Sequence, residues 1–155
     1  MKKLILLPLA ALFAQAAVAD EVVNKQVTVT ATIPTATFFV EGFGSNWMNE
    51  VQDLAYDPRS DSLYNIDRQI QVKSTIGPIE ASLVNDPQMS NGAEDIPLKV
   101  SIDGKALSTV AQKLTTAAGD AKILDFQIAA IKPATGYKPG AYQGMVNMMF
   151  ETAAP

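Results

Sequence analysis

The chain has 155 residues, with twelve basic and sixteen acidic side chains, and it contains neither cysteine nor histidine. These two absences exclude Cys–His and Ser–His–Asp nucleophile systems and the usual ligand sets for zinc, copper and haem. The sequence has no basic stripe, so nucleic acid is not expected as a partner. We therefore expect one domain with no metal or other cofactor, stabilised by its core or by neighbouring chains and not by disulfides.

The first nineteen residues have the pattern of a secretory signal peptide. Met1-Lys2-Lys3 is basic, residues 4–13 are apolar, and Ala17-Val18-Ala19 offers a cleavage site between small residues. The apolar run is too short to span a bilayer, so we expect residues 1–19 to be removed and the mature chain to be exported. The mature chain would keep ten basic and all sixteen acidic residues, a net charge of −6.

The mature chain is predicted to open with an isolated strand at residues 25–34. Apolar residues recur there at every second position, with threonines between them, and a proline closes the run: Val27, Val29, Ala31, Ile33 and Pro34. A period of two is typical of a half-buried strand. No hairpin partner precedes it, so the strand must pair with a distant segment of its own domain or with another subunit.

Further strands are predicted at residues 35–40, 64–73, 79–84, 96–102, 105–110, 124–130 and 142–150. Asp103-Gly104 joins two of them and predicts a tight hairpin, because this dipeptide tolerates positive backbone φ angles. In the last strand, Tyr142, Val146, Met148 and Phe150 share one phase. Residues 110–118 could form a brief helix, the one helix that the pattern allows after the signal peptide. Seven or eight short strands predict an all-β, immunoglobulin-like sandwich.

A few residues stand out from this pattern as candidates for binding. Arg68 falls on the apolar phase of its strand, where it could extend at a sheet edge, pair with an acid or contact another subunit. Trp47 could stack on a sugar together with Phe43 and Tyr56, although single aromatic residues in a sandwich are more often part of the core.

Two acidic groups are candidates for a cation site or for catalysis. Asp53, Asp57 and Asp61 could surround calcium, but Pro58 and Arg59 interrupt the spacing of a known loop and favour a turn. Glu94-Asp95 is interpreted as a solvated pair in a polar loop and not as a catalytic one. The sequence therefore does not predict an enzyme.

Blocks along nearly the whole mature chain resemble one family. They include Lys25–Pro34, Leu54–Pro58, Gln71–Thr75, Leu83–Gln88, Ile96–Ser101, Gly104–Thr109 and Pro139–Val146. In order and spacing they are similar to the major subunits of class-five fimbriae, the CFA/I-like pilins of enterotoxigenic enteric bacteria assembled by the alternate chaperone pathway.

The resemblance implies an incomplete sandwich at residues 35–155 and a donor extension at residues 20–34. The extension of the next subunit would fill the groove by strand addition, with Val27, Val29, Ala31 and Ile33 as plugs and Pro34 at the boundary. Tyr142, Val146, Met148 and Phe150 would line the groove and meet a chaperone.

The family also implies partners and a location. They are identical subunits in a homopolymer, a periplasmic chaperone, an outer-membrane usher and a tip adhesin subunit, in a fimbrium at the cell surface that supports adhesion to host surfaces. The alternative function is a minor pilin or adhesin-type module, in which Arg68 or Trp47 contacts a host glycan or protein.

Overall fold

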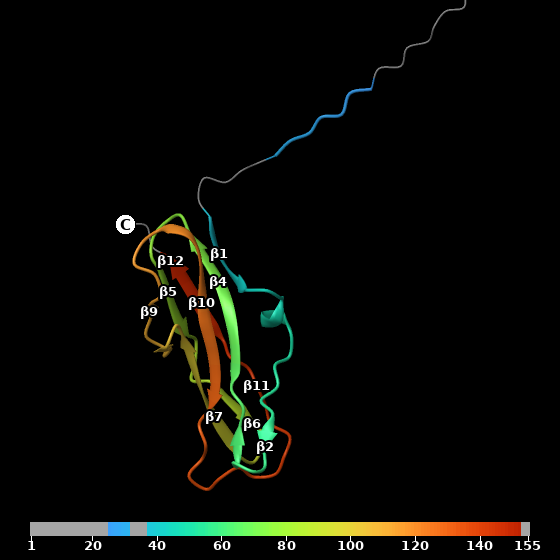
Figure 1. Ribbon diagram of the computed structural model, residues 1–155, viewed down its shortest axis with the longest axis vertical. Coiled ribbons are helices and arrows are strands. Elements are labelled where there is room, and N and C mark those ends of the chain that lie inside the picture. Colours follow the sequence, from blue (N-terminus) through green and yellow to red (C-terminus); the bar gives the residue numbers. More distant parts are fainter. Residues whose placement is uncertain (1–24, 32–36, 153–155) are drawn as a thin grey trace, which may run out of the picture. The chain divides into compact units, whose positions relative to one another are not determined.

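The computed structural model describes residues 25–31 and 37–152 (Figure 1). The chain divides into two units after Ile33, and each is described by itself. The predicted signal peptide lies outside the described residues, as do Ile33 and Pro34. Residues 25–31 are exposed and form neither helix nor strand, so the strand predicted there is not formed within a single chain.

The larger of two main sheets has seven strands in the order β1–β4–β10–β7–β6–β11, with β8 also paired to β7. Every ladder between described strands is antiparallel. The strands are β1 (Phe38–Gly42), β4 (Ile66–Ser74), β6 (Gln88–Ser90), β7 (Asp95–Ile102), β8 (Lys105–Ala106), β10 (Gly119–Ala130) and β11 (Gln143–Gly144). The longest, β10, pairs with β4 on one side and with β7 on the other.

The smaller sheet has the order β12–β5–β9, formed by β5 (Ile79–Leu83), β9 (Gln112–Lys113) and β12 (Met148–Thr152). It lies behind the layer of β4 and β10 in Figure 1. A separate hairpin of β2 (Tyr56–Asp57) and β3 (Ser62–Leu63) and a short 3-10 helix, η1 (Trp47–Asn49), follow β1 along the chain. The arrangement is a two-layer β-sandwich.

The core lies between these two layers and follows the period-two pattern of the sequence. In β7, for example, Ile96, Leu98, Val100 and Ile102 are buried while the residues between them are more exposed. Phe126 of β10 is the largest of the fully buried side chains. The remaining members of the core cluster come from both sheets, from η1 and from the chain just after β8: Trp47, Ile66, Ile70, Val72, Ile79, Ala81, Leu83, Leu107, Leu124 and Ile128.

The hairpin predicted at Asp103-Gly104 is confirmed. Asp103 has φ of 50° and Gly104 has φ of 75°, the pair of positive values that a tight turn between twisted strands needs. The brief helix considered at residues 110–118 is wrong, because β9 pairs there with β5. No helix among the described residues is long and apolar enough to cross a membrane.

The last predicted strand, residues 142–150, is corrected by the structure. It is split into β11, which pairs with β6, and β12, which pairs with β5 in the other sheet. Residues 145–147 make the crossing between the two layers and belong to neither strand. Tyr142 therefore precedes β11 and lies apart from the strand that carries Met148 and Phe150.

Candidate functional site

The sandwich is unfilled on the side where β1 ends one sheet and β12 ends the other. Phe38 and Val40 of β1 lie opposite Ser74 and Val72, and both of these partners are buried. Phe38 itself is 37% exposed, and Val40 is only partly buried. The core-facing side chains of this edge strand therefore lack a covering layer.

The same imbalance exists along β12. Met148 and Phe150 lie opposite Leu83 and Ala81, which are buried, while Met148 and Phe150 remain partly exposed. β12 pairs with β5 alone among the described strands, so its outer backbone edge has no ladder partner. Together, Phe38 and Val40 of β1 with Met148 and Phe150 of β12 define what we call the open side of the sandwich.

A cavity of about 380 Å³ lies at one end of the open side. Its lining residues come from both edge strands and from the chain around β5: Phe38, Pro78, Glu80, Glu151 and Thr152. Ser74 Oγ and Thr152 Oγ1 lie 2.8 Å apart and link the two sheets there by a hydrogen bond. We call this space the β1–β12 cavity. The first residue of β1, Phe38, and the last residue of β12, Thr152, both line this cavity. β1 therefore begins where β12 ends, and the two edge strands run in opposite directions.

The described part of the N-terminal segment carries the complementary feature. Val27 is 82% exposed and Val29 is 86% exposed, and Ala31 is also exposed. Two large aliphatic side chains at alternate positions, with threonine between them, make one apolar edge without a strand partner. The N-terminal segment thus exposes an apolar edge that has no strand partner. The open side of the sandwich has core-facing side chains that no strand covers.

The predicted acceptor residues do not all lie together. Val146, Met148 and Phe150 are partly buried against the core cluster. Tyr142 is not part of that cluster, and its hydroxyl donates a hydrogen bond to the Lys138 carbonyl oxygen at 3.0 Å. Sequence reasoning does not single out Phe38 and Val40, although their shared phase in the apolar run before Glu41 is a usable signal.

Trp47 lies in the core and offers no surface for a ligand in this structure. It is 5% exposed, and its ring centroid lies 5.0 Å from that of Phe126. Its Nε1 donates to the Gln69 carbonyl oxygen at 3.0 Å. Gly42 permits this position, because a Cβ atom there would lie 2.7 Å from Trp47 Nε1.

Arg68 is exposed although its position in β4 falls on the core-facing phase. β1 pairs with β4 only as far as Ile70, so the sheet edge is free beside Arg68. The guanidinium turns outward, with Nε donating to Gln52 Oε1 at 3.2 Å and Nη1 donating to the Asp67 carbonyl oxygen at 3.4 Å. This is the edge position expected of a long side chain with a charged end.

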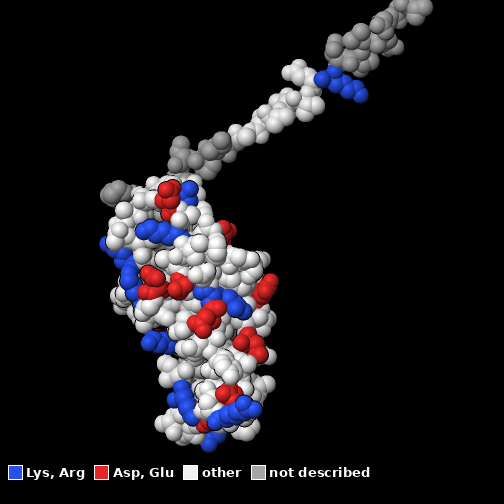
Figure 2. Space-filling model, in the orientation of Figure 1, with Lys and Arg blue, Asp and Glu red and all other residues white. Residues whose placement is uncertain are grey.

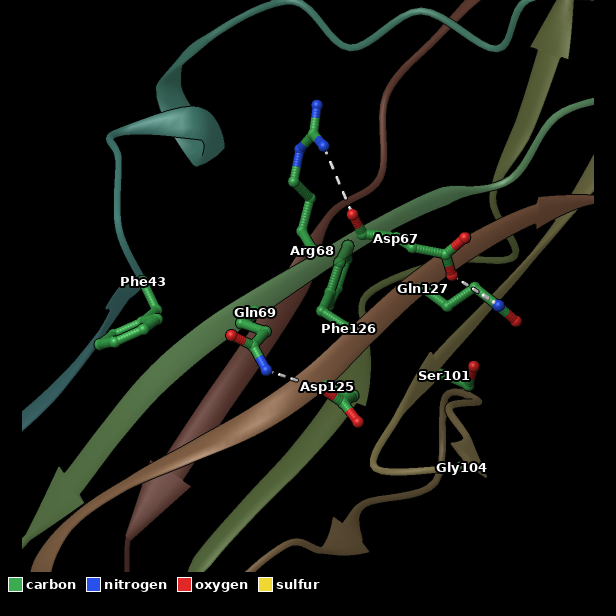
Figure 3. A pocket seen from close by; sticks show the side chains of 9 residues that line it. All are labelled: Phe43, Asp67, Arg68, Gln69, Ser101, Gly104, Asp125, Phe126 and Gln127. Atoms are coloured by element: carbon green, nitrogen blue, oxygen red, sulfur yellow. Dashed lines mark hydrogen bonds between the residues drawn. The ribbon is translucent and has the colours of Figure 1, made fainter.

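A polar hollow of about 600 Å³ lies near Arg68 on β4 and β10 (Figure 3). Two cross-strand hydrogen bonds order it: Gln69 Nε2 donates to Asp125 Oδ1 at 3.0 Å, and Gln127 Nε2 donates to Asp67 Oδ1 at 2.7 Å. Phe43, which is partly exposed, lies at its margin. Acidic and basic side chains are interspersed over the face drawn in Figure 2.

The acidic residues around the β2–β3 turn have structural partners. Asp57 accepts hydrogen bonds from the Arg59 amide and the Ser60 hydroxyl, which lower its pKa. Asp61 accepts from Lys132 Nζ at 2.5 Å and from the Tyr56 hydroxyl at 2.9 Å, and these two donors hold the pKa of Asp61 below its ordinary range. The described residues contain no group of three or more acidic side chains placed to hold a metal ion.

The described strands thus form a two-layer antiparallel sandwich with an open side. The solved structure of the CooA pilin subunit from enterotoxigenic Escherichia coli is similar to this fold, with a TM-score of 0.54 and 21% identity over 76% of this chain and 87% of that chain. The incomplete immunoglobulin-like sandwich predicted from the sequence is thereby confirmed.

The family described as CS1 type fimbrial major subunit matches residues 23–151, and the chain belongs to this family. Two CFA/I fimbrial subunits are similar over 149 residues, covering 86% of this chain and 87% of each relative. One, from Escherichia coli, is 28% identical, and the other, from Escherichia coli O78:H11 (strain H10407 / ETEC), is 27% identical. The predicted resemblance is confirmed, and the chain is a structural subunit of a fimbrial shaft.

Proposed function

We propose that this fimbrial subunit polymerises through donor-strand exchange, in which residues 25–33 of one copy fill the open side of another. The observation that carries the proposal is the unequal burial of core-facing neighbours: Val72 and Ala81 are 1% exposed, while the edge residues opposite them are only partly buried. An added strand would pair with the free edge of β12 and cover these side chains.

Burying the apolar side chains of the added strand would stabilise the contact between two subunits enough for a durable polymer. Val27, Val29 and Ile33 would each gain about 1.5–3 kcal/mol on burial and Ala31 less, on the order of 5–10 kcal/mol gross before ordering costs. The hydrogen bonds of an added ladder contribute further. Because each joint is head-to-tail, repetition without closure builds a filament.

A subunit with an open side is prone to aggregate before it polymerises, so it needs assembly partners. Before polymerisation, the free edge of β12 and the uncovered apolar side chains would promote aggregation. We propose that a periplasmic chaperone lends a strand to the open side, that an outer-membrane usher exports the subunit, and that a tip adhesin subunit ends the fibre. The assembled fimbrium would support adhesion to host surfaces.

A thermal melt tests the missing strand directly. Residues 35–155 alone are compared with the same domain carrying residues 20–34 after Pro155 on a flexible linker. We expect a monomer whose melting temperature is higher by about 10 °C or more. The same fusion with Val29→Asp in the appended segment is the matched control and should gain little. Equal melting curves for all three proteins would mean that the sandwich is already complete.

A second candidate function is recognition of a host glycan by the polar hollow. Its ordered amides and carboxylates could exchange hydrogen bonds with sugar hydroxyls, and the exposed ring of Phe43 could stack on a sugar face. Fibres carrying Phe43→Ala should then lose glycan binding while their length is unchanged. Glycan binding that survives this substitution would count against the hollow.

A further inference from the structure

The turn between β6 and β7 contains the chain's one Asn-Gly dipeptide, Asn91-Gly92. Ser90 and Asp95 form the last pair of the β6–β7 ladder before this turn, and Gly92 is exposed with φ of 90°. A Cβ atom at Gly92 would meet nothing within 4 Å, so water can reach the turn. Because glycine has no side chain to hinder the approach, its backbone nitrogen can attack the side-chain amide of the asparagine before it.

Two backbone amides hold the side-chain oxygen of Asn91. Ala93 N and Glu94 N donate to Asn91 Oδ1 at 2.9 Å and 2.8 Å. The Asn91 amide donates to the Glu94 carbonyl oxygen at 3.1 Å, which closes the turn around the side chain. Two N–H groups on one carbonyl oxygen stabilise the negative charge that develops there when a nucleophile attacks the carbonyl carbon. The turn therefore has the donor arrangement of an oxyanion hole at Asn91 Cγ.

The side-chain nitrogen of Asn91 takes no part in these contacts. Within the described part of the chain, the hydrogen bonds of this side chain go through Oδ1. Nδ2 lies against Gly140, where a Cβ atom would be 2.6 Å away. The Gly92 amide, the nucleophile, donates to Ser90 Oγ at 3.1 Å. Loss of Nδ2 as ammonia would thus leave the two donors on Oδ1 in place.

We infer that Asn91 is a site of spontaneous deamidation and that the folded turn directs the reaction to aspartate. Gly92 N loses its proton to hydroxide and forms a bond to Asn91 Cγ. The bond from Cγ to Nδ2 breaks, and the nitrogen takes a proton from water and leaves as ammonia. The product is a cyclic succinimide, which a second water molecule hydrolyses without any oxidant or reductant.

Water can open the succinimide at either of its two carbonyl carbons. Attack at the backbone carbonyl carbon of residue 91 breaks its bond to Gly92 N and gives isoaspartate, in which the chain runs through the side chain. Attack at Cγ restores the ordinary backbone with aspartate at position 91. Because the Ala93 and Glu94 amides polarise the Cγ carbonyl, the folded turn favours aspartate. The new carboxylate would accept the same two hydrogen bonds, strengthened by its charge.

Peptide mapping by mass spectrometry tests the site. Fimbriae shed from cells are stored in mildly alkaline buffer at body temperature, and the conversion of each asparagine is followed over time. Two other exposed asparagines, Asn49 and Asn65, are internal controls, since each is followed by a residue with a side chain. We expect Asn91 to convert at least about tenfold faster than either control, because glycine leaves the approach open. Conversion at Asn91 that is no faster than at the controls would overturn the site.

The ratio of the two products tests the role of the fold. Peptides with aspartate or isoaspartate at position 91 are separated by chromatography and distinguished by labelling with an isoaspartyl methyltransferase. Folded fimbriae should give aspartate in at least about threefold excess, because both donors act on the Cγ carbonyl. The same protein held in denaturant loses these donors and should give mainly isoaspartate. Equal ratios in the two samples would show that the turn does not direct the reaction.

Discussion

Phe150 lies directly opposite Ala81 in the β5–β12 ladder, and although both face the core, Ala81 is 1% exposed while Phe150 keeps part of its surface open. Phe38 and Val40 show the same imbalance across the open side, in the other sheet. A surface that is apolar, core-facing and uncovered at two edges offers a place for the added strand that we propose. Its properties therefore depend on what fills it.

The first prediction concerns the filling strand. Val29→Asp should abolish fibres, because burying an unpaired carboxylate costs several kcal/mol, which lowers the stability of the joint by more than about a hundredfold. The chaperone complex should remain intact, since the chaperone would supply its own strand. Electron microscopy of shed fibres and co-purification of the chaperone complex measure the two effects.

Thr30→Asp is the matched control for that substitution. Thr30 stands on the opposite phase from Val29, so a carboxylate there would face water in the joint. Its fibres should be close to normal in length. Normal fibres from Val29→Asp, or equal loss from both variants, would contradict the alternating arrangement of plugs.

The second prediction concerns the end of β1. Gly42→Ala should lower the free energy of unfolding by about 1–3 kcal/mol, because the added Cβ meets Trp47 Nε1 and the Ser45 carbonyl oxygen, each at 2.7 Å. Gly119→Ala, where an added Cβ would meet nothing within 4 Å, should change it little. Urea unfolding of both variants measures the difference. Equal stability would show that Trp47 can move without cost.

Local features of this fold were predictable, and pairings between distant residues were not. The Asp103-Gly104 hairpin and the alternation of β4 and β7 follow from neighbouring residues alone. The opposition of Glu80 and Glu151 depends on the register of strands that are about seventy positions apart, which no local pattern contains.

The division of residues 142–150 and the burial of Trp47 have the same physical origin. Residues 142–150 alternate well enough for one strand, but β6 and β5 each offer an edge in a different layer, and the chain divides between them. Trp47 follows a glycine-rich loop that resembles an exposed turn, and its burial depends on the space above Gly42. In both cases tertiary packing decided between local alternatives.

The third prediction concerns pH. The Lys132 ammonium and the Tyr56 hydroxyl lower the pKa of Asp61, so the folded state holds fewer protons than the unfolded state near the ordinary aspartate pKa of about 4. The stability from this group is present above that pH and is lost as the pH falls through the lowered pKa. Melting temperatures measured from about pH 6 to pH 2 should therefore fall less steeply for Asp61→Asn than for the unsubstituted protein.

Asparagine is the suitable replacement at this position. Asp61 has φ of 46°, and asparagine tolerates that left-handed backbone region as aspartate does. The substitution thus removes the titrating charge while the turn keeps its conformation. An identical pH slope in both proteins would mean that the pair with Lys132 contributes nothing to stability.

The fourth prediction separates Trp47 from Arg68, which are both candidates for contact with a receptor. Trp47→Ala should cost about 3–5 kcal/mol of folding stability, because it removes a buried ring packed against Phe126 and leaves a cavity. Arg68→Ala should change stability by less than about 0.5 kcal/mol, since its guanidinium makes only exposed hydrogen bonds. Chemical unfolding of the two variants measures this contrast. A stable Trp47→Ala protein would refute the core role of the ring, and shortened fibres from a stable Arg68→Ala protein would assign Arg68 to a contact between subunits.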